Sequence, residues 1–429
     1  MAVAAGRRLR IGGRKWPVVA LICLIAVGTV IFLAQDPRTL HVESRLAIED
    51  PAFPDYIATV VDAPVTRGDA YDVLQNGDQI YPAMLDAIAK ARRRIVFETY
   101  NYKAGEIGER FTIALMDAAR RGVAVRLVLD SFGATPAPPR IRERMREAGV
   151  RLAWFNPFGI WTVESTNNRT HRKVLVVDGE VGFTGGAGVA DHWLGDAQGE
   201  AHWRDTQFRV NGPAVRLLEA SFFENWVEAG GRDAPELDLG EPPGPGHSRS
   251  LVIWSNPIGG VSNVKLLFLY SIAAARRRIE IQSPYFIPDG SARKALVDAR
   301  RRGVEVRVLT DGDVTDVKSV KHASRNLYQP LLEAGVQIFE FQPTMMHTKV
   351  MVIDGQWSVF GSGNFDNRSL ELNDEITVAV ADPDLGRQLL DAFEKDLTRS
   401  KAWSAEAWQR RPWHWKVREK FWGLFDEVF

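Results

Sequence analysis

The sequence predicts an α/β protein built from two similar halves that follow one transmembrane helix. Three observations lead to this prediction. Helical patterns that end at glycine alternate with β-branched strand patterns. The passages of the first half recur in the second half. An uncharged run near the N-terminus is long enough to cross a membrane. Each half is expected to form a mixed, largely parallel sheet flanked by helices.

The N-terminal run covers residues 16–34 and follows a cluster of Arg and Lys. At about 1.5 Å per residue, a helix over this run is roughly 28 Å long, close to the hydrocarbon core of a bilayer. The basic flank predicts a cytoplasmic N-terminus, a single pass of the cell (inner) membrane, and the remaining chain on the outer side. The alternative is a cleaved signal peptide, but Phe32 and Leu33 lie where such a peptide needs small residues.

The composition of the chain disfavours some partners and sites, and its Pro- and Gly-rich segments suggest its domain boundaries. The formal net charge is zero, which disfavours a nucleic-acid partner. Cys23 is the only cysteine, so neither an internal disulfide nor a cysteine-based metal site can form. The expected parts are a basic flank and anchor (1–35), a stalk (36–70), a first domain (71–230), a Pro- and Gly-rich linker (231–250), a second domain (251–400) and a Trp-rich tail (401–429).

The repeat is visible in three pairs of passages. Each pair has the order helix, glycine stop and β-branched strand, or part of that order. The pairs are residues 87–95 with 271–279, 118–127 with 299–308, and 147–150 with 333–336. A repeat of this length indicates two whole domains of the same kind.

Each half contains one motif with a His and a Lys two residues apart, followed by an apolar run and an Asp-Gly turn. On a strand, residues two apart point to the same face, so an imidazole and an ammonium lie side by side. A single His-x-Lys has little value as a signal, but two copies at matching repeat positions are rarely accidental. The motif residues are His171, Lys173 and Asp178 in the first half and His347, Lys349 and Asp354 in the second.

This pair of motifs suits phosphodiester chemistry. Lysines neutralise the non-bridging oxygens of a phosphate and follow them into the transition state. One imidazole attacks phosphorus, and the other gives a proton to the leaving alkoxide. The residues alone do not decide which histidine has which role. No cofactor or metal is required, and no His, Asp and Glu cluster has convincing metal-ligand spacing.

These motifs resemble the double HxKxxxxD signature of the phospholipase D superfamily, over residues from about 71 to 400. Residues 77–85, 203–205 and 283–288 are similar to the bacterial cardiolipin synthase branch in particular. The resemblance implies two phospholipase D-like domains that share one cleft and a phosphohistidine intermediate. It also implies that His171 is the nucleophile and His347 the general acid.

The resemblance further implies residues that support this pair. Asp205 and Glu375 match carboxylates that hold the catalytic imidazoles and lie further along the chain, and their alternative is a surface salt bridge. Asn364 matches a phosphate-binding amide, and Ser362 is grouped with it. The first half has Gly188 at the place of Asn364, so its backbone N–H or the Asn168 side chain would have to substitute. Asp178 and Asp354 are counted with the catalytic motif, but we expect them to support the turn.

The tail contains five Trp residues between Trp403 and Trp422, with basic residues among them. If a helix begins at Pro412, then Trp415, Trp422, Phe425 and Phe429 share one face. Such a helix would lie in a membrane interface or pack on the catalytic domain, and the sequence leaves both open.

The expected function is therefore phosphatidyl transfer by a membrane-anchored enzyme. Its substrate would be a phosphatidylglycerol-type lipid, and the acceptor would be a lipid headgroup or another alcohol. Hydrolysis by water through the same intermediate is the alternative. A nuclease would need a basic, aromatic-lined groove, which the neutral charge and the anchor disfavour. A non-enzymatic binding module predicts decay of a motif, and both motifs are intact. The oligomeric state stays open.

Overall fold

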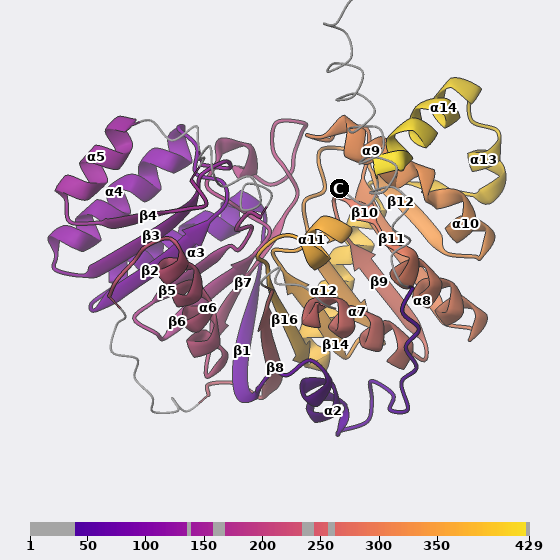
Figure 1. The fold of residues 1–429 in the computed structure, drawn as a ribbon, viewed down its shortest axis with the longest axis horizontal. Coiled ribbons are helices and arrows are strands. Elements are labelled where there is room, and N and C mark those ends of the chain that lie inside the picture. Colours follow the sequence, from indigo (N-terminus) through magenta and orange to yellow (C-terminus); the bar gives the residue numbers. More distant parts are fainter. Residues whose placement is uncertain (1–38, 135–138, 158–167, 234–243, 256–261, 426–429) are drawn as a thin grey trace, which may run out of the picture. The chain divides into compact units, whose positions relative to one another are not determined.

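The computed structural model describes residues 39–134, 139–157, 168–233, 244–255 and 262–425. Its centre is a 15-stranded sheet with the order β17-β12-β11-β9-β13-β14-β16-β8-β1-β7-β6-β5-β2-β3-β4 (Figure 1). The order of strands from β4 to β1 repeats from β12 to β8, which is the repeat that the sequence predicts. The two halves join through an antiparallel pair, β1 (Val65–Gln75) and β8 (Ser248–Trp254).

The first half follows the alternation of helix and strand expected from its sequence. Its elements are α3 (Asn76–Lys90), β2 (Arg94–Thr99), α4 (Glu106–Arg120), β3 (Ala124–Asp130), α5 (Pro139–Glu147), β4 (Arg151–Phe155), β5 (Val174–Val177), β6 (Val181–Gly185), η1 (Asp191–Trp193), β7 (Thr206–Asn211) and α6 (Ala214–Glu228).

The second half repeats this pattern with two additional short strands. Its elements are α7 (Asn263–Ala274), β9 (Arg278–Gln282), β10 (Phe286–Ile287), α8 (Gly290–Arg301), β11 (Glu305–Asp311), α9 (Lys318–Asn326), α10 (Tyr328–Glu333), β12 (Gln337–Phe341), β13 (Val350–Ile353), β14 (Trp357–Gly361), β15 (Phe365–Asp366), α11 (Asn367–Glu371), β16 (Ile376–Ala381) and α12 (Pro383–Leu397). Strands β10 and β15 pair in a separate two-stranded sheet.

The prediction of a mixed sheet is confirmed, but the sheet is not largely parallel. Only the outer strands β2, β3 and β4, and their counterparts β9, β11 and β12, are parallel to one another. The Asp-Gly turns after β5 and β13 return the chain as hairpins, so the central strands run antiparallel. Gly122 and Gly303 end α4 and α8 in the left-handed region, each at φ 88°, which explains the repeated Arg-Gly-Val passages.

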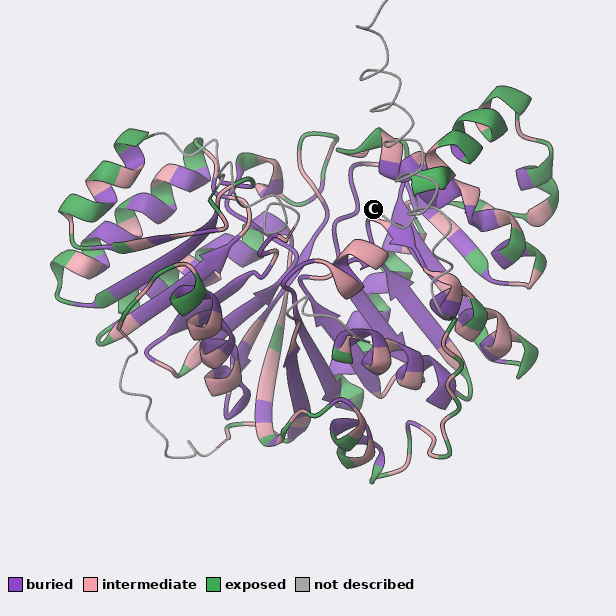
Figure 2. Ribbon diagram, viewed as in Figure 1, coloured by how far each residue is buried: buried purple, intermediate pink, exposed green. Residues whose placement is uncertain are grey.

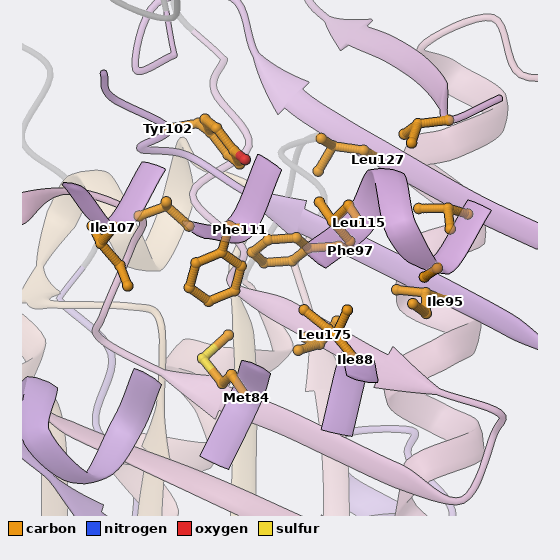
Figure 3. Packing of buried hydrophobic residues seen from close by; sticks show 14 of the residues in the cluster. Met84, Ile88, Ile95, Phe97, Tyr102, Ile107, Phe111, Leu115, Leu127 and Leu175 are labelled. Atoms are coloured by element: carbon orange, nitrogen blue, oxygen red, sulfur yellow. The ribbon is translucent and has the colours of Figure 1, made fainter. Parts of the chain in front are cut away.

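Alternate residues of the strands enter two different cores. On one face, Phe97, Phe111 and Leu115 belong to a cluster formed with helices α3, α4 and α5 (Figure 3). On the other face, helices α6 and α12 cover a cluster drawn from both halves. In that shared cluster the rings of Phe208 and Phe360 stack with centroids 3.6 Å apart. Burial on both faces explains why the strands read as continuous apolar runs (Figure 2).

The described part of the expected stalk belongs to the folded domain. Residues Phe53–Val60 form helix α2, in which Phe53 and Ile57 are fully buried. The Phe53 ring meets Trp357 edge-on at 5.2 Å. Strand β1 begins at Val65, six residues before the predicted boundary at 71. Apolar contacts with the second half outweigh the prolines that suggested an extended stalk, so this prediction was wrong from Phe53 onward.

The tail is also part of the folded domain. Strand β17 (Ser400–Trp403) extends the sheet beside β12, and Trp408 of α13 (Ala405–Gln409) is fully buried against Tyr328. Helix α14 (Trp413–Trp422) packs on α9 and continues into η2 (Gly423–Phe425). Across the described ranges, no helix combines the length and the apolarity that a membrane span requires. The predicted span at 16–34 lies outside those ranges.

Candidate active site

Two short backbone bridges connect the halves at the motif histidines. Thr170 forms a parallel bridge with Asp374, and the His171 N–H donates to the Asp374 carbonyl at 2.9 Å. Arg204 forms the matching bridge with Met346, and the His347 N–H donates to the Arg204 carbonyl at 2.7 Å. Each histidine is thereby placed beside the residue that follows the bridge on the opposite half. Those residues are Glu375 and Asp205.

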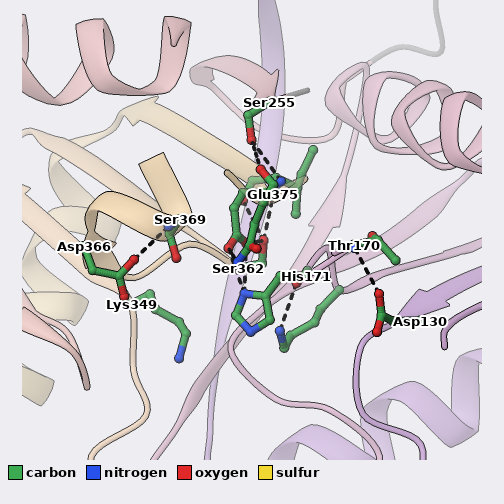
Figure 4. Close-up of polar contacts among 12 residues, drawn as sticks. Asp130, Thr170, His171, Ser255, Lys349, Ser362, Asp366, Ser369 and Glu375 are labelled. Atoms are coloured by element: carbon green, nitrogen blue, oxygen red, sulfur yellow. Dashed lines mark hydrogen bonds and ion pairs between the residues drawn. The ribbon is translucent and has the colours of Figure 1, made fainter. Parts of the chain in front are cut away.

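The His171 imidazole is held by a carboxylate from the second half. Its Nδ1 lies 2.8 Å from Oε1 and 3.1 Å from Oε2 of Glu375, which is fully buried (Figure 4). The Ser362 hydroxyl donates to Glu375 Oε2 at 2.5 Å, and the Glu375 N–H donates to the Ser255 hydroxyl at 3.0 Å. With Nδ1 engaged in this way, Nε2 is the nitrogen left for chemistry.

The His347 imidazole is held in the same manner by the first half. Its Nδ1 lies 2.7 Å from Oδ2 of the fully buried Asp205. The Trp193 indole N–H donates to the same oxygen at 2.8 Å, and the Thr206 N–H donates to Oδ1 at 2.8 Å. The pairing is therefore crossed: each histidine uses the carboxylate of the other half. The resemblance did not indicate which half supplies each carboxylate, and the bridges place it on the opposite half.

Both histidines line a single pocket of about 560 Å³. This volume lies within the range of ordinary ligand sites, roughly 300 to 1,000 Å³. The walls combine aromatic, cationic and acidic side chains from both halves. Besides the two histidines, the lining residues include Tyr100, Asn101, Lys103, Phe132, Arg169, His192, Trp203, Tyr285, Asp316, Val317, Val320, Asn364, Asp366 and Arg368.

The two motif lysines are buried beside the histidines. Lys173 Nζ donates to the His171 carbonyl at 2.9 Å, and Lys349 Nζ donates to the His347 carbonyl at 2.6 Å. Burial lowers the pKa of Lys173 to about 8 and that of Lys349 to about 7, although Glu375 and Asp205 oppose the shift. Two ammonium groups that are poorly solvated gain much from an arriving phosphate.

Burial also keeps the imidazoles neutral in the free protein. It lowers the pKa of His171 to about 4, against the attraction of Glu375. It lowers the pKa of His347 well below the ordinary value, and the charges of Lys349 and Lys173 add to this shift. A neutral imidazole has the free lone pair that nucleophilic attack requires.

The two supporting carboxylates differ in their protonation. The charges and hydrogen bonds around Glu375, above all those from His171, overcome its burial and lower its pKa. For Asp205 burial prevails and raises the pKa to about 6, despite the nearby Lys349. Glu375 is thus firmly ionised at neutral pH, whereas Asp205 lies close to its titration range.

Two predicted phosphate ligands have different surroundings. Asn364 lines the pocket, and its Oδ1 is buried without a hydrogen-bond partner in the described structure. Ser362 does not face a ligand: its single hydroxyl proton goes to Glu375, and its oxygen accepts from the Ile376 N–H at 3.0 Å. The prediction of Ser362 as a phosphate ligand was therefore wrong, because it has no donor to spare.

Neither of the substitutes suggested for Asn364 in the first half lines the pocket. Asn168 bonds to Asp374 at 3.2 Å and does not line the pocket. Gly188 lies against the Cβ of Asn101, which would be 2.8 Å from any side chain added there. Asn101 itself lines the pocket on this side. An amide residue of the first half that lines the pocket thus comes from the loop after β2, which position matching between the motifs did not indicate.

The motif aspartates hold the chain, as their expected role in the turn suggested. The Asp178 carboxylate accepts from the N–H groups of residues 92–94, and the Asp354 carboxylate accepts from those of residues 276–278. Both lie beyond the far ends of β5 and β13, and neither lines the pocket. Their inclusion among the catalytic residues was wrong, because backbone donors occupy both carboxylates.

Several pocket residues were not identified from the sequence. The Tyr100 ring meets the His171 ring edge-on, with their centroids 5.2 Å apart. The rings of Trp193 and Trp203 have centroids 5.3 and 5.4 Å from that of His347. His192 is packed against Trp203, with centroids 3.8 Å apart, and lines the same pocket. The passage at 203–205 resembled the family, but nothing local marks the loops after β2 and β6 as parts of one site.

One group of potential metal ligands occurs among the residues described. His247, Asp382 and Asp384 offer ligand atoms within 4.8 Å of one another. Asp382 already caps helix α12 through the N–H groups of Asp384 and Leu385. None of the three lines the pocket, so this group takes no part in the site.

Comparisons with known proteins agree with this architecture. The family model described as "Cardiolipin synthase, PLD-like domain" matches residues 84–213 and again 268–397. Cardiolipin synthase 1 of Bacillus anthracis is 33% identical over 366 residues, covering 83% of this chain and 72% of that protein. Cardiolipin synthase A of Pseudomonas aeruginosa is 36% identical over 346 residues, covering 80% and 70%.

Solved structures show the same fold at much lower identity. The phosphatidylserine synthase of Haemophilus influenzae superposes with a TM-score of 0.67 at 13% identity, covering 88% of this chain and all of that one. The family model matches twice, once in each half of the sheet, and the relatives align along most of their length. The chain therefore belongs to the phospholipase D superfamily, in its cardiolipin synthase branch, and is an enzyme of that superfamily.

Proposed function

We propose that this protein is a membrane-anchored phosphatidyltransferase of the cardiolipin synthase type, acting through a phosphohistidine. The observation that carries the proposal is the pair of imidazoles in one pocket, each bound at Nδ1 to a buried carboxylate. This arrangement leaves two Nε2 atoms available to one phosphorus, one for attack and one for proton transfer. The similarity to cardiolipin synthases supports a phospholipid substrate.

In the first half-reaction, His171 Nε2 attacks the phosphorus of a phosphatidylglycerol-type donor. The P–N bond forms while the P–O bond to the glycerol headgroup breaks. The leaving oxygen takes a proton from His347 Nε2, so glycerol departs as a neutral alcohol. Glu375 supports His171 in this step, because an ionised carboxylate on Nδ1 makes Nε2 a better nucleophile.

In the second half-reaction, the hydroxyl of a second lipid headgroup attacks the phosphohistidine. His347 Nε2 takes the proton from that hydroxyl, the new P–O bond forms, and the P–N bond breaks. His171 leaves as a neutral imidazole, and the product is cardiolipin. His347 takes its proton from solvent when the donor binds, because the phosphate charge raises the low pKa of this imidazole.

Cations of the site suit substrates that carry phosphate. Lys173 and Lys349 lie beside the histidines, and Lys103, Arg169 and Arg368 line the pocket. Both the donor and the acceptor are anionic lipids in this proposal, so charges on both sides of the histidine pair are useful. The predicted anchor at 16–34 would keep the enzyme at its substrates, with the catalytic domains on the outer side of the cell membrane.

The test uses the full chain in detergent and a phosphatidyl ester of p-nitrophenol, a leaving group that departs without a proton. His347→Ala should release about one equivalent of p-nitrophenol and keep a phosphatidyl group on His171, measured by mass at alkaline pH. His171→Ala should release none. An adduct on His347 in the His171→Ala variant, or no adduct in a His347→Ala variant that still shows the burst, contradicts the assignment.

A second measurement separates transfer from the competing reactions. Wild-type protein with phosphatidylglycerol should give cardiolipin and glycerol. Phosphatidic acid as the main product would instead establish hydrolysis. Because the pocket has aromatic and cationic walls, single-stranded DNA is included, and its cleavage at a rate near that of the lipid would favour the nuclease.

A further inference from the structure

Helix α14 presents an exposed apolar stripe that is different from the one predicted. Trp413, Val417 and Phe421 are 75%, 59% and 54% exposed, and Leu424 of η2 continues the row at 60%. Spacings of four, four and three residues place them on one face. The stripe expected from the sequence included Trp415 and Trp422, but these turn toward the protein, and Phe429 lies outside the described residues.

The segment that carries this stripe holds more than half of the exposed large hydrophobic side chains in the described ranges. Among the residues described, nine large hydrophobic side chains are exposed, and five of them lie between Trp413 and Phe425. Two of the others, Phe132 and Val317, line the catalytic pocket. Monomeric proteins seldom gather exposed apolar groups in this way unless another surface meets them.

The charges on α14 indicate what kind of surface this is. The exposed charged residues of the helix are Lys416, Arg418 and Lys420, all of them positive. Its single acid, Glu419, is buried and forms an ion pair with Arg411 at 2.5 Å. Basic residues flanking an apolar stripe rich in Trp and Phe are typical of a helix that lies in the interface of an anionic bilayer.

The stripe is also connected to the pocket. Trp422 packs in a cluster with Tyr285 and Val320, and both of these line the pocket. Val317 directly precedes α9, the helix on which α14 lies (Figure 1). A pocket of about 560 Å³ accommodates headgroups, whereas whole diacyl lipids exceed the size of ligands that such pockets enclose.

We propose that α14 and η2 dock the catalytic domain on an anionic lipid bilayer, with Trp413, Val417, Phe421 and Leu424 inserted among the headgroups. The mouth of the pocket then meets the membrane through Phe132 and Val317. Lipid headgroups enter the pocket while their acyl chains stay in the bilayer. The entry route rests on the lipid substrate proposed above, whereas the membrane contact does not.

The membrane contact of α14 is tested without measuring enzyme activity. The full-length protein carries Cys23→Ser, and an environment-sensitive dye is attached at Val417→Cys. It is placed in vesicles of phosphatidylglycerol and phosphatidylcholine that contain nitroxide-labelled lipid as the quencher. Val227→Cys is the matched control, because Val227 is an equally exposed valine, at 62%, on helix α6. We expect the nitroxide to quench the dye at position 417 at least about twofold, and that at 227 very little.

Equal quenching at the two positions overturns the proposal. Disulfide cross-linking between two copies through Val417→Cys in detergent would also overturn it, because the stripe would then be an interface between copies.

The entry route is tested by activity. Phe421→Glu should lower the rate on long-chain phosphatidylglycerol in vesicles by about tenfold or more, since it removes a buried aromatic contact with lipid. The same variant should keep its rate on dispersed short-chain phosphatidylglycerol, and Val227→Glu should keep both. An unchanged vesicle rate for Phe421→Glu overturns the entry route. Wild-type protein inactive on both lipids would refute the proposed function while leaving the quenching result intact.

Discussion

The two halves of the site share one plan but support their histidines differently. Fifteen residues after each motif histidine, the second half has Ser362 and the first half has Gly186. Ser362 gives its hydroxyl to Glu375, whereas a side chain added at Gly186 would begin only 2.2 Å from the Asp205 carboxylate. The first half uses the indole of Trp193 in place of that hydroxyl. The pKa values differ as well: the contacts of Glu375, above all those with His171, lower its pKa, whereas burial raises the pKa of Asp205 to about 6.

This difference teaches how a repeated fold can divide two roles. A nucleophile benefits from a carboxylate that stays charged, because the charge stabilises the positive imidazole in the transition state. A group that cycles between acid and base needs a partner that does not fix it in one protonation state. The Glu375 side thus suits His171 as nucleophile, and the Asp205 side suits His347 as proton carrier.

The largest expected effect follows from neutralising one carboxylate at a time. Glu375→Gln should lower kcat by as much as about 10⁴-fold, the loss that an amide causes in place of a triad carboxylate. Asp205→Asn should cost at least about tenfold less, since Asp205 is already close to neutral below pH 6. Steady-state rates at about pH 5.5, where Asp205 is mostly neutral and Glu375 is ionised, measure both. Equal losses would mean that the pKa difference has no catalytic meaning.

The two motif lysines extend the comparison of the halves, because their charges depend on pH. Lys349, with a pKa of about 7, loses its charge as the pH rises from 6 to 9, and Lys173, with a pKa of about 8, follows. Each lost charge-assisted contact is worth about 1.5–3 kcal/mol, so the KM for an anionic donor should rise roughly 10- to 100-fold for each lysine that loses its charge. The imidazoles titrate below this pH range and do not contribute.

The control is Lys349→Arg, whose guanidinium keeps its charge throughout. Its KM should rise less steeply than that of the wild type, with the remaining rise due to Lys173. Binding of a non-reactive phosphonate analogue at each pH gives the same information where the variant turns over slowly. A KM that falls with rising pH would contradict the charge assignment.

The smallest effect is expected for Ser362, which was wrongly predicted to be a phosphate ligand. Ser362→Ala removes one hydrogen bond to Glu375, which is worth about 1.5–3 kcal/mol for a charged acceptor, so kcat should fall roughly 10- to 100-fold with KM nearly unchanged. A phosphate ligand would show the reverse pattern, with a raised KM. Ser369→Ala is the matched control, because its hydroxyl lies near the pocket and has no contact with Glu375.

Much of the fold followed from the sequence because repeats and glycine stops are local signals. The positions of His171, Lys173, His347 and Lys349 in one site also followed, since a matched pair of motifs implies a shared cleft. The crossed partners did not follow. The bridges at Thr170 and Arg204 are tertiary contacts, and no local pattern reveals which half a carboxylate will face.

The tail shows a second limit of the sequence, which concerns the orientation of a helix. Trp-rich composition and helical periodicity correctly indicated a short amphipathic helix, but they did not show which face the protein covers. Trp415 lies 5.6 Å from the Arg325 guanidinium, and Trp422 enters the cluster beside Val320. Long-range packing decided which aromatic residues are left for a partner.

The crossed pairing of histidine and carboxylate has a consequence for the ancestry of the chain. A polypeptide of half this length would carry one imidazole and one acid that do not meet within the same molecule. Two identical copies, bridged as Thr170–Asp374 and Arg204–Met346 are here, would each complete the other. Within one chain the two acids can differ, and here one is a glutamate beside a serine and the other is an aspartate beside a glycine.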